Sequence, residues 1–339
     1  MFTPISVRAL SAIILPMILM LATGCGEEPE ENPPVADPAG PWSRGAPLQM
    51  ERQELPVVEL DGKIYAIGGI VSRTRLTNTV EVYDPATDRW SAAAPLPIGT
   101  HHSAAVVAGG KIYVMGGWDN LFFARPLNRI FAYDPATDRW TEKARMPTGR
   151  GSPAGAAIDG RIYLAGGDPG GNLLTVYDPA TDRWSRLADM PTARQHTSAV
   201  SHGGKLYVLG GRSELGAGVG NVDAAEVFDP ATGEWTRLAP MPTARGGLAA
   251  AVAGPYLLTF GGEGNPADPT GTFPEVEAYD TRTGTWQSLS PMPTPRHGIG
   301  AATVDGRIYI PGGGPLQGFA TSGVTEIYDT SLELTPDAG

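Results

Sequence analysis

The chain has 339 residues, a formal net charge of −11, 45 Gly, 32 Pro and a single Cys. So many turn-forming residues beside an ordinary apolar fraction of 41% indicate a globular, turn-rich protein and argue against a mostly helical one. The sequence has only four Lys and no basic run, which excludes nucleic acid as a partner because phosphates require clustered cations.

Residues 1–24 are predicted to be a signal peptide. Arg8 precedes the apolar run ALSAIILPMILMLA, which is too short to span a bilayer comfortably. The run ends in LATGC, which resembles a bacterial lipobox, and the resemblance implies that Cys25 is lipidated and becomes the mature N-terminus. Ala22 departs from that pattern, which usually has Leu three residues before the Cys. The alternative is an ordinary cleaved signal peptide followed by an unmodified Cys.

Residues 25–41 are predicted to be the lipidated Cys and a disordered tether. The segment GEEPEENPPVADPAGP is acidic and rich in Pro, with no apolar periodicity. Because Cys25 is the only thiol, we expect no internal disulfide, no Cys-based catalysis and no Cys-based metal site. A lipid anchor and a tether together predict a lipoprotein of the bacterial cell envelope, in the outer membrane or facing the periplasm.

An internal repeat occupies nearly all of the remaining chain. The segment YDPATDRW occurs unchanged at 83–90, 133–140 and 177–184, and FDPATGEW (228–235) and YDTRTGTW (279–286) are variants of it. In every unit a Gly-Gly pair begins 26 residues after a Trp, and only the stretch between Gly-Gly and Tyr-Asp varies in length. The Trp residues of the repeat are 42, 90, 140, 184, 235 and 286, and the pairs begin at 68, 116, 166, 210, 261 and 312. A period of this length indicates a repeat architecture.

Each unit predicts four short strands. A run of small residues such as SAAVVA (103–108) comes first, followed by a turn and an alternating segment such as KIYVMGG (111–117). A third strand such as VEVYD (80–84) leads into the turn DPATD, which has Pro at its second position. The Trp segment supplies the fourth strand.

The Gly-Gly pairs, the Tyr-Asp pairs and the Trp residues together resemble kelch repeats, which form the blades of β-propellers. The resemblance covers residues 42–330 and implies an all-β, six-bladed kelch-type β-propeller, followed by a C-terminal tail at 331–339. The segment PWSRGAPLQMER (41–52) has a Trp strand without a Gly-Gly pair before it, and YDTSLELT (328–335) has no Trp. We therefore expect the N-terminal strand around Trp42 to complete the last blade. The alternative, that SLELT (331–335) is the last strand, leaves Trp42 unexplained.

Arginines at a repeated position are the first candidate site. Ten residues after the Trp, five of the six units have Arg and one has Thr100. Propeller geometry and the kelch resemblance imply that these guanidinium groups surround the mouth of the central channel and bind an acidic ligand. The alternative is structural: each Arg pairs with a backbone carbonyl or with the Glu of the neighbouring ExYD segment, which is Glu81, Glu226, Glu277 or Glu326. The candidate ligand-binding arginines are Arg52, Arg150, Arg194, Arg245 and Arg296.

Residues that break the repeat are the second set of ligand-binding candidates: His102, Trp118, Arg212 and Glu263. Trp118 begins the loop WDNLFFARP, and exposed aromatic residues there would suit a sugar or a protein partner. Alternatively, Phe122 and Phe123 fold back over the blade. His102 and His196 occupy matching positions in blades that are not adjacent, so the sequence predicts no metal site and no cofactor.

These observations predict a membrane-anchored, extracytoplasmic binding module. We expect its variable-loop face to bind an unknown protein or glycan, acidic if the arginines are the site, and we expect the chain to be monomeric. The kelch resemblance also implies an alternative, a carbohydrate-active enzyme of the sugar mutarotase or epimerase kind, in which Arg194 or Arg245 would work with Glu263 in proton transfer. Kelch-like copper radical oxidases are excluded because their Tyr–Cys crosslink requires a thiol.

Overall fold

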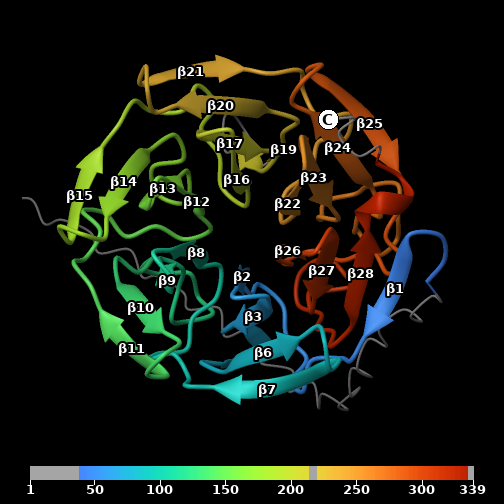
Figure 1. Cartoon of the computed structure of the whole chain (residues 1–339), viewed down its shortest axis with the longest axis horizontal. Coiled ribbons are helices and arrows are strands. Elements are labelled where there is room, and N and C mark those ends of the chain that lie inside the picture. Colours follow the sequence, from blue (N-terminus) through green and yellow to red (C-terminus); the bar gives the residue numbers. More distant parts are fainter. Residues whose placement is uncertain (1–37, 214–219, 335–339) are drawn as a thin grey trace, which may run out of the picture. The chain divides into compact units, whose positions relative to one another are not determined.

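A computed structural model of the chain describes residues 38–213 and 220–334. The signal peptide, Cys25 and all but the last residues of the tether lie outside this range. Six four-stranded antiparallel sheets surround a central channel as the blades of a propeller (Figure 1), which confirms the predicted six-bladed architecture. Among the described residues, no helix is long and apolar enough to cross a membrane.

The first five blades share one strand order: the first strand of each blade lies at the channel, and the second, third and fourth follow in sequence toward the rim. Blade 1 consists of β2 (Val57–Leu60), β3 (Lys63–Ile67), β6 (Val80–Asp84) and β7 (Arg89–Ala93). Blade 2 consists of β8 (Ala104–Ala108), β9 (Lys111–Met115), β10 (Ile130–Asp134) and β11 (Arg139–Glu142). Blade 3 consists of β12 (Ala154–Ile158), β13 (Arg161–Ala165), β14 (Leu174–Asp178) and β15 (Arg183–Arg186). Blade 4 consists of β16 (Ser198–His202), β17 (Lys205–Leu209), β20 (Ala225–Asp229) and β21 (Glu234–Arg237). Blade 5 consists of β22 (Ala249–Ala253), β23 (Tyr256–Phe260), β24 (Val276–Asp280) and β25 (Thr285–Leu289).

Blade 6 joins the two ends of the propeller. It consists of β26 (Ala302–Val304), β27 (Arg307–Pro311), β28 (Thr325–Asp329) and the N-terminal β1 (Trp42–Gly45). β1 pairs antiparallel with β28, with Trp42 opposite Tyr328 (Figure 1). The N-terminal closure is therefore confirmed. The alternative of a closing strand at 331–335 is wrong for its described part, because a 3-10 helix, η1 (Thr330–Leu332), begins there.

The same set of hydrogen bonds recurs in several blades, and it explains why the sequence repeats YDPATDRW unchanged. In blade 2 the Asp138 carboxylate accepts a hydrogen bond from the Tyr133 hydroxyl at 2.8 Å and another from the Ala94 N–H of blade 1 at 2.8 Å. Trp140 Nε1 donates to the carbonyl of the same Ala94 at 2.8 Å. Asp138 has φ 51°, a left-handed conformation that Asp tolerates better than most residues. We call this Tyr–Asp–Trp grip on the preceding blade the clamp.

The clamp of blade 6 is assembled from both ends of the chain. Trp42 Nε1 donates to the carbonyl of Ser290 in blade 5 at 3.2 Å, and the Ser290 N–H donates to the Glu333 carboxylate at 3.0 Å. Tyr328 also donates its hydroxyl to Glu333, and Leu334 is buried in the core of blades 5 and 6. The propeller therefore continues to Leu334, which corrects the expectation that the domain ends at residue 330 and that only a tail follows.

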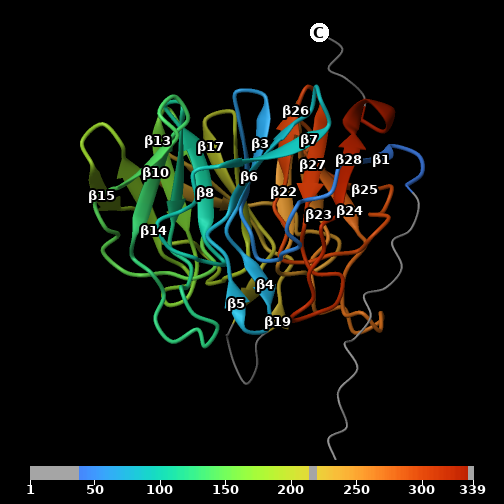
Figure 2. The same ribbon diagram turned by 90° about the horizontal axis from the view of Figure 1, so that it is seen from below.

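The two faces of the propeller differ. The connections from the second to the third strand of each blade, which vary in length, lie on one face, together with the two small hairpins that some of them form (Figure 2). We call this the loop face, and we call the opposite face, which carries the short DGK and DPATD turns, the turn face. The hairpins are β4 (Ile70–Ser72) with β5 (Arg75–Leu76), and β18 (Arg212–Ser213) with β19 (Gly220–Asn221).

Candidate functional site

The five repeated arginines lie inside the propeller. Each is at most 1% exposed, so none of them offers a guanidinium group to a ligand at the channel mouth. Arg245 donates to the Glu277 carboxylate at 2.6 Å and to Thr259 Oγ1 at 2.7 Å. Burial lowers the pKa of Arg245, and the Glu277 carboxylate opposes that shift. Arg52 pairs in the same way with Glu81, Arg194 with Glu226 and Arg296 with Glu326. The expected ring of exposed arginines is wrong, and the structural alternative describes them.

The remaining two units show that the arginine and its carboxylate belong together. Arg150 has Thr175 where four other units have Glu, and it donates to Thr175 and to the carbonyls of Leu164 and Leu173, the latter two at 3.1 Å. The unit that lacks the arginine has Thr100 in its place, and Phe131 stands at its Glu position. A buried guanidinium without a carboxylate is tolerated once, and a buried carboxylate without a guanidinium does not occur in this set.

Two positions after each arginine, and after Thr100 in the unit that lacks one, six residues close around the channel axis. All six have left-handed φ, although four of them are not Gly. Each backbone N–H donates to the carbonyl of the equivalent residue in the preceding blade, at 2.7–3.3 Å, so that the six bonds form a closed circle. The residues of this axial ring are Glu54, His102, Ser152, His196, Gly247 and Gly298, with φ of 56°, 53°, 48°, 49°, 69° and 58°. Left-handed φ costs free energy in residues other than Gly and concentrates at functional sites, so these four side chains are candidates for function.

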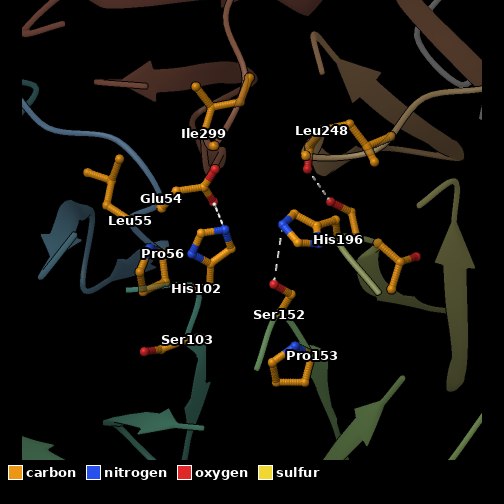
Figure 3. A pocket seen from close by; sticks show the side chains of 14 residues that line it. Glu54, Leu55, Pro56, His102, Ser103, Ser152, Pro153, His196, Leu248 and Ile299 are labelled. Carbon is orange, nitrogen blue, oxygen red and sulfur yellow. Dashed lines mark hydrogen bonds and ion pairs between the residues drawn. The ribbon is translucent and has the colours of Figure 1, made fainter. Parts of the chain in front are cut away.

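Polar side chains of the axial ring line a cavity of about 120 Å³ at this end of the channel. Figure 3 shows Glu54, His102, Ser152 and His196 around it, with ion-pair and hydrogen-bond contacts between neighbours. The Glu54 carboxyl lies 3.1 Å from His102 Nε2, and Ser152 Oγ lies 3.5 Å from His196 Nε2. Beyond the axial ring, the first strands of the blades line a wider cavity of about 460 Å³, with many Ala and Ser side chains.

The rings of His102 and His196 contact each other, with their centroids 4.9 Å apart. The sequence argument against a histidine cluster assumed that residues of non-adjacent blades stay apart. That assumption is wrong here, because six residues close a circle of backbone hydrogen bonds around the axis and side chains can meet across it.

A chain of hydrogen bonds leads from Glu54 to the loop of blade 2. His101 Nε2 lies 3.0 Å from the Asn120 carbonyl, which can only accept, so this nitrogen carries a proton. His101 Nδ1 then accepts from His102 Nδ1 at 2.5 Å, which leaves His102 Nε2 without a proton. Glu54 is therefore the donor to His102 and is protonated in this arrangement.

The electrostatics agree with that assignment. Burial, and next the charge of Glu263, raise the pKa of Glu54 to about 8, so its neutral form dominates at pH 7. Burial also lowers the pKa of His102 well below its usual value. A second arrangement holds the same number of protons: Glu54 is ionised, His102 carries its proton on Nε2, and His101 is doubly protonated. Burial lowers the pKa of His101 as well, so the arrangement with a neutral Glu54 is the favoured one.

A second layer of polar groups lies on the loop side of the axial ring. It comes from residues that directly follow the Gly-Gly pairs, here Arg212 and Glu263, and from His297. Glu263 contacts Arg212 through Oε1, and Glu263 Oε2 lies 3.5 Å from His297 Nε2. His297 Nε2 also lies 3.8 Å from the Glu54 carboxyl, which links the two layers.

Trp118 is not the exposed aromatic residue that the sequence led us to expect. Its side chain is only 2% exposed and stacks on His101, with the ring centroids 5.9 Å apart. It fits because the facing residue is Gly151, where a Cβ would overlap the indole ring. The two phenylalanines of its loop differ, since Phe123 packs edge-on against Trp118 at 5.0 Å whereas Phe122 is 90% exposed.

The structure thus gathers His102, Arg212 and Glu263 from the predicted set at one site, and Trp118 packs edge-on against the His102 ring with the centroids 5.6 Å apart. It places the five arginines elsewhere in the interior. The sequence analysis missed Glu54 and His297 and set His196 aside. A signal for Glu54 and His196 was present in the repeat, because the aligned position has Gly in two units and another residue in four.

Fold and site together define a six-bladed propeller whose channel is closed at the loop face by a polar cluster. Comparison with known families agrees with this architecture. The Kelch motif model matches residues 52–97, 99–147 and 149–191, and the model for the KLHDC2/KLHL20/DRC7 Kelch-repeats domain matches residues 171–314. The chain is a kelch-repeat β-propeller.

Known relatives share part of this chain. Kelch-like protein terF of Aspergillus terreus is 42% identical over 113 residues, which cover 33% of this chain and 24% of that protein. Kelch-like ECH-associated protein 1B of Danio rerio is 36% identical over 88 residues, which cover 26% of this chain and 15% of that protein. The match therefore spans a quarter or less of each relative. The solved structure of YjhT has a TM-score of 0.70 at 18% identity, covering 83% of this chain and 96% of that chain, and it supports the fold alone.

Proposed function

We propose that this protein is a membrane-anchored, extracytoplasmic binding module that recognises a partner protein or a glycan with its loop face. The observation that carries the proposal is the gathering on one face of three features: the connections that vary in length, exposed aromatic side chains and the polar end of the channel. Loops on a rigid scaffold are where propellers and other folds place recognition. The relatives are named as kelch-like proteins, and their names identify no ligand for this chain.

Two exposed phenylalanines mark the contact surface. Phe122 is 90% exposed in the connection between β9 and β10, and Phe319 is 37% exposed in the connection between β27 and β28. The guanidinium of Arg73, from a third connection on this face, lies 5.9 Å from the Phe319 ring. Aromatic faces of this kind stack on sugar rings and anchor protein interfaces.

The enzymatic alternative loses the residues that the sequence suggested for it. Arg194 and Arg245 are buried and paired with Glu226 and Glu277, so neither can act with Glu263 on a sugar. We therefore keep binding as the proposed activity.

A photo-crosslinking experiment in the cell envelope tests the proposal. A photoreactive phenylalanine replaces Phe122 on the loop face or, as the control, the exposed Ala136 on the turn face. We expect a discrete protein or glycan adduct from position 122 and none from position 136. Equal adducts from both faces, or none from either together with no retention on purified envelope glycans, would contradict the proposal.

Anchoring is tested separately by Cys25→Ser. If the lipid holds the protein, this variant leaves the membrane fraction while it retains its loop-face adducts. Labelled fatty acid incorporated equally into the parent and the variant would exclude Cys25 as the anchor.

A further inference from the structure

Three side chains direct one ligand atom each to a common point on the loop side of the axial ring. Glu54, Glu263 and His297 each place a carboxylate oxygen or an imidazole nitrogen there, and these atoms all lie within 4.8 Å of one another. The three residues come from the first, fifth and sixth blades, so only the closed propeller brings them together. Their side chains are 10%, 7% and 1% exposed.

The spacing of these atoms suits ligands of one ion better than direct hydrogen bonds. His297 Nε2 lies 3.5 Å from Glu263 Oε2 and 3.8 Å from Glu54 Oε1, beyond the roughly 2.7–3.2 Å of a good hydrogen bond. Ligands bound about 2.0–2.2 Å from a zinc ion at tetrahedral angles are separated by approximately 3.3–3.6 Å. A small closure around an ion would therefore bring all three into coordination.

Each of the three ligands is already oriented by an outer partner. His297 Nδ1 donates to the Gly314 carbonyl at 3.0 Å; Nε2 lies 3.3 Å from the Gly318 carbonyl, but that carbonyl already accepts from Gln53 Nε2 at 2.7 Å, so the Nε2 lone pair can serve an ion at the site. Arg212 holds Glu263 through Oε1, the oxygen that is not directed to the site. Glu54 contacts His102 through Oε2 and directs Oε1 inward. This is the outer-shell arrangement of metal-binding His and carboxylate side chains.

An unsatisfied buried acceptor lies beside the same cluster. Gln53 is 1% exposed and donates through Nε2 to the Gly318 carbonyl at 2.7 Å, but its Oε1 has no hydrogen-bond partner in the described part of the chain. This oxygen and the His297 ring lie on the same side of Gly314, where an added Cβ would touch both. A water bound to an ion at the cluster would give this acceptor a donor.

We propose that Glu54, Glu263 and His297 form a site for one divalent transition-metal ion of the zinc type. One imidazole beside two carboxylates favours Zn²⁺ over Mg²⁺ or Ca²⁺, which prefer oxygen ligands alone. Binding of the ion displaces the proton of Glu54, and the cation then neutralises two adjacent carboxylates whose one guanidinium partner among the described residues is Arg212. Three protein ligands leave at least one coordination position for water or for a donor atom of a bound partner.

Zinc titration of the full chain tests this site. The protein carries Cys25→Ser, so that no thiol competes, and is first stripped with a chelator. We expect isothermal titration to show one Zn²⁺ per chain, with Mg²⁺ and Ca²⁺ bound far more weakly. Glu263→Gln and His297→Gln each weaken zinc binding by at least the roughly 10- to 100-fold that follows loss of an outer-shell partner.

Matched controls on the turn side of the molecule are Glu59→Gln and His202→Gln, which should bind zinc as the parent does. Circular dichroism establishes that each variant is folded. If a buried substitution prevents folding, zinc-edge X-ray absorption of the parent decides, since the site requires an N/O shell with one imidazole. No stoichiometric zinc on the parent, a shell without imidazole, or unchanged affinity in folded Glu263→Gln and His297→Gln would each overturn the proposal.

Discussion

At the scale of single residues, the buried arginines are part of the architecture. In blade 5 Arg245 pairs with Glu277, whereas in blade 2 the same two positions are occupied by Thr100 and Phe131. The salt bridge fastens the segment that enters a blade to the third strand of that blade, and its removal from one side leaves a buried charge without a partner.

The pair of blade 2 supplies a natural replacement with which to test this role. We expect Arg245→Thr alone to lower the free energy of unfolding by about 3–5 kcal/mol, because Glu277 is left buried and unpaired. The double variant Arg245→Thr with Glu277→Phe, which copies Thr100 and Phe131, should recover part of that loss. Urea unfolding without any ligand measures both. Additive losses in the double variant would show that the two residues are not coupled.

How far these residues could be predicted follows from what spacing can and cannot reveal. The fixed distance from Trp to Arg, and the Glu of the ExYD segment, were sufficient to name the four salt bridges as an alternative. The sequence did not reveal that the arginines are buried, because burial depends on how far each side chain extends under its own blade. Glu54 was missed because its importance arises from the closed axial ring, which joins residues from all six blades.

At the scale of elements, the clamp converts a turn into a contact between neighbouring blades. Asp88, Asp138 and Asp182 each accept from a Tyr of their own blade and from an Ala N–H of the preceding one. The sequence predicted the turn from local rules. It did not predict the grip on the preceding blade, which depends on the angle between two sheets.

These clamps predict a specific acid sensitivity. Hydrogen bonds from Tyr83 and from Ala46 lower the pKa of Asp88, and those from Ala94 and Tyr133 lower the pKa of Asp138. A carboxylate whose pKa is lowered by folding stabilises the native state above its unfolded pKa of about 3.9, and that stability is lost as the pH falls through the folded value. Replacing Asp88, Asp138 and Asp182 by Asn retains an acceptor without a charge, so the triple variant should lose less stability than the parent below about pH 4.

Melting temperatures between pH 7 and pH 2.5 give the comparison. A matched triple replaces Asp61, Asp159 and Asp305 by Asn, since these residues also have left-handed φ, of 53°, 50° and 48°, but lie in the first turn of a blade. The control should follow the parent. If both triples differ from the parent alike, the acid sensitivity has its origin in net charge and not in the clamps.

At the scale of the whole molecule, closure of the propeller brings the side chains of different blades together at the channel. The count of six blades and the pairing of the N-terminal strand with the last blade followed from the phase of the repeat, because the chain begins with the part of a unit that its end lacks. The same reasoning placed the C-terminal boundary too early. Glu333 takes the place of the clamp Asp, because it follows Tyr328 by five residues as Asp88 follows Tyr83, so the spacing of the repeat already indicated that the last blade extends past residue 330.

Truncation from either end tests how the closure is shared between the termini. A chain that begins at Leu48 loses β1, exposes the edge of β28 and empties the position of Trp42, whose side chain is 6% exposed and contacts Tyr328 and Phe260. Loss of a buried Trp alone costs about 3–5 kcal/mol, and an unpaired edge invites aggregation. A chain that ends at Ser331 loses Glu333 and Leu334, so the hydroxyl of Tyr328 and the N–H of Ser290 lose their acceptor. A chain that ends at Leu334 keeps both residues and serves as the control. We expect the first two chains to melt well below the control in differential scanning calorimetry, the first more than the second. If the chain ending at Ser331 melts with the control, Glu333 contributes nothing to closure and β1 closes the ring alone.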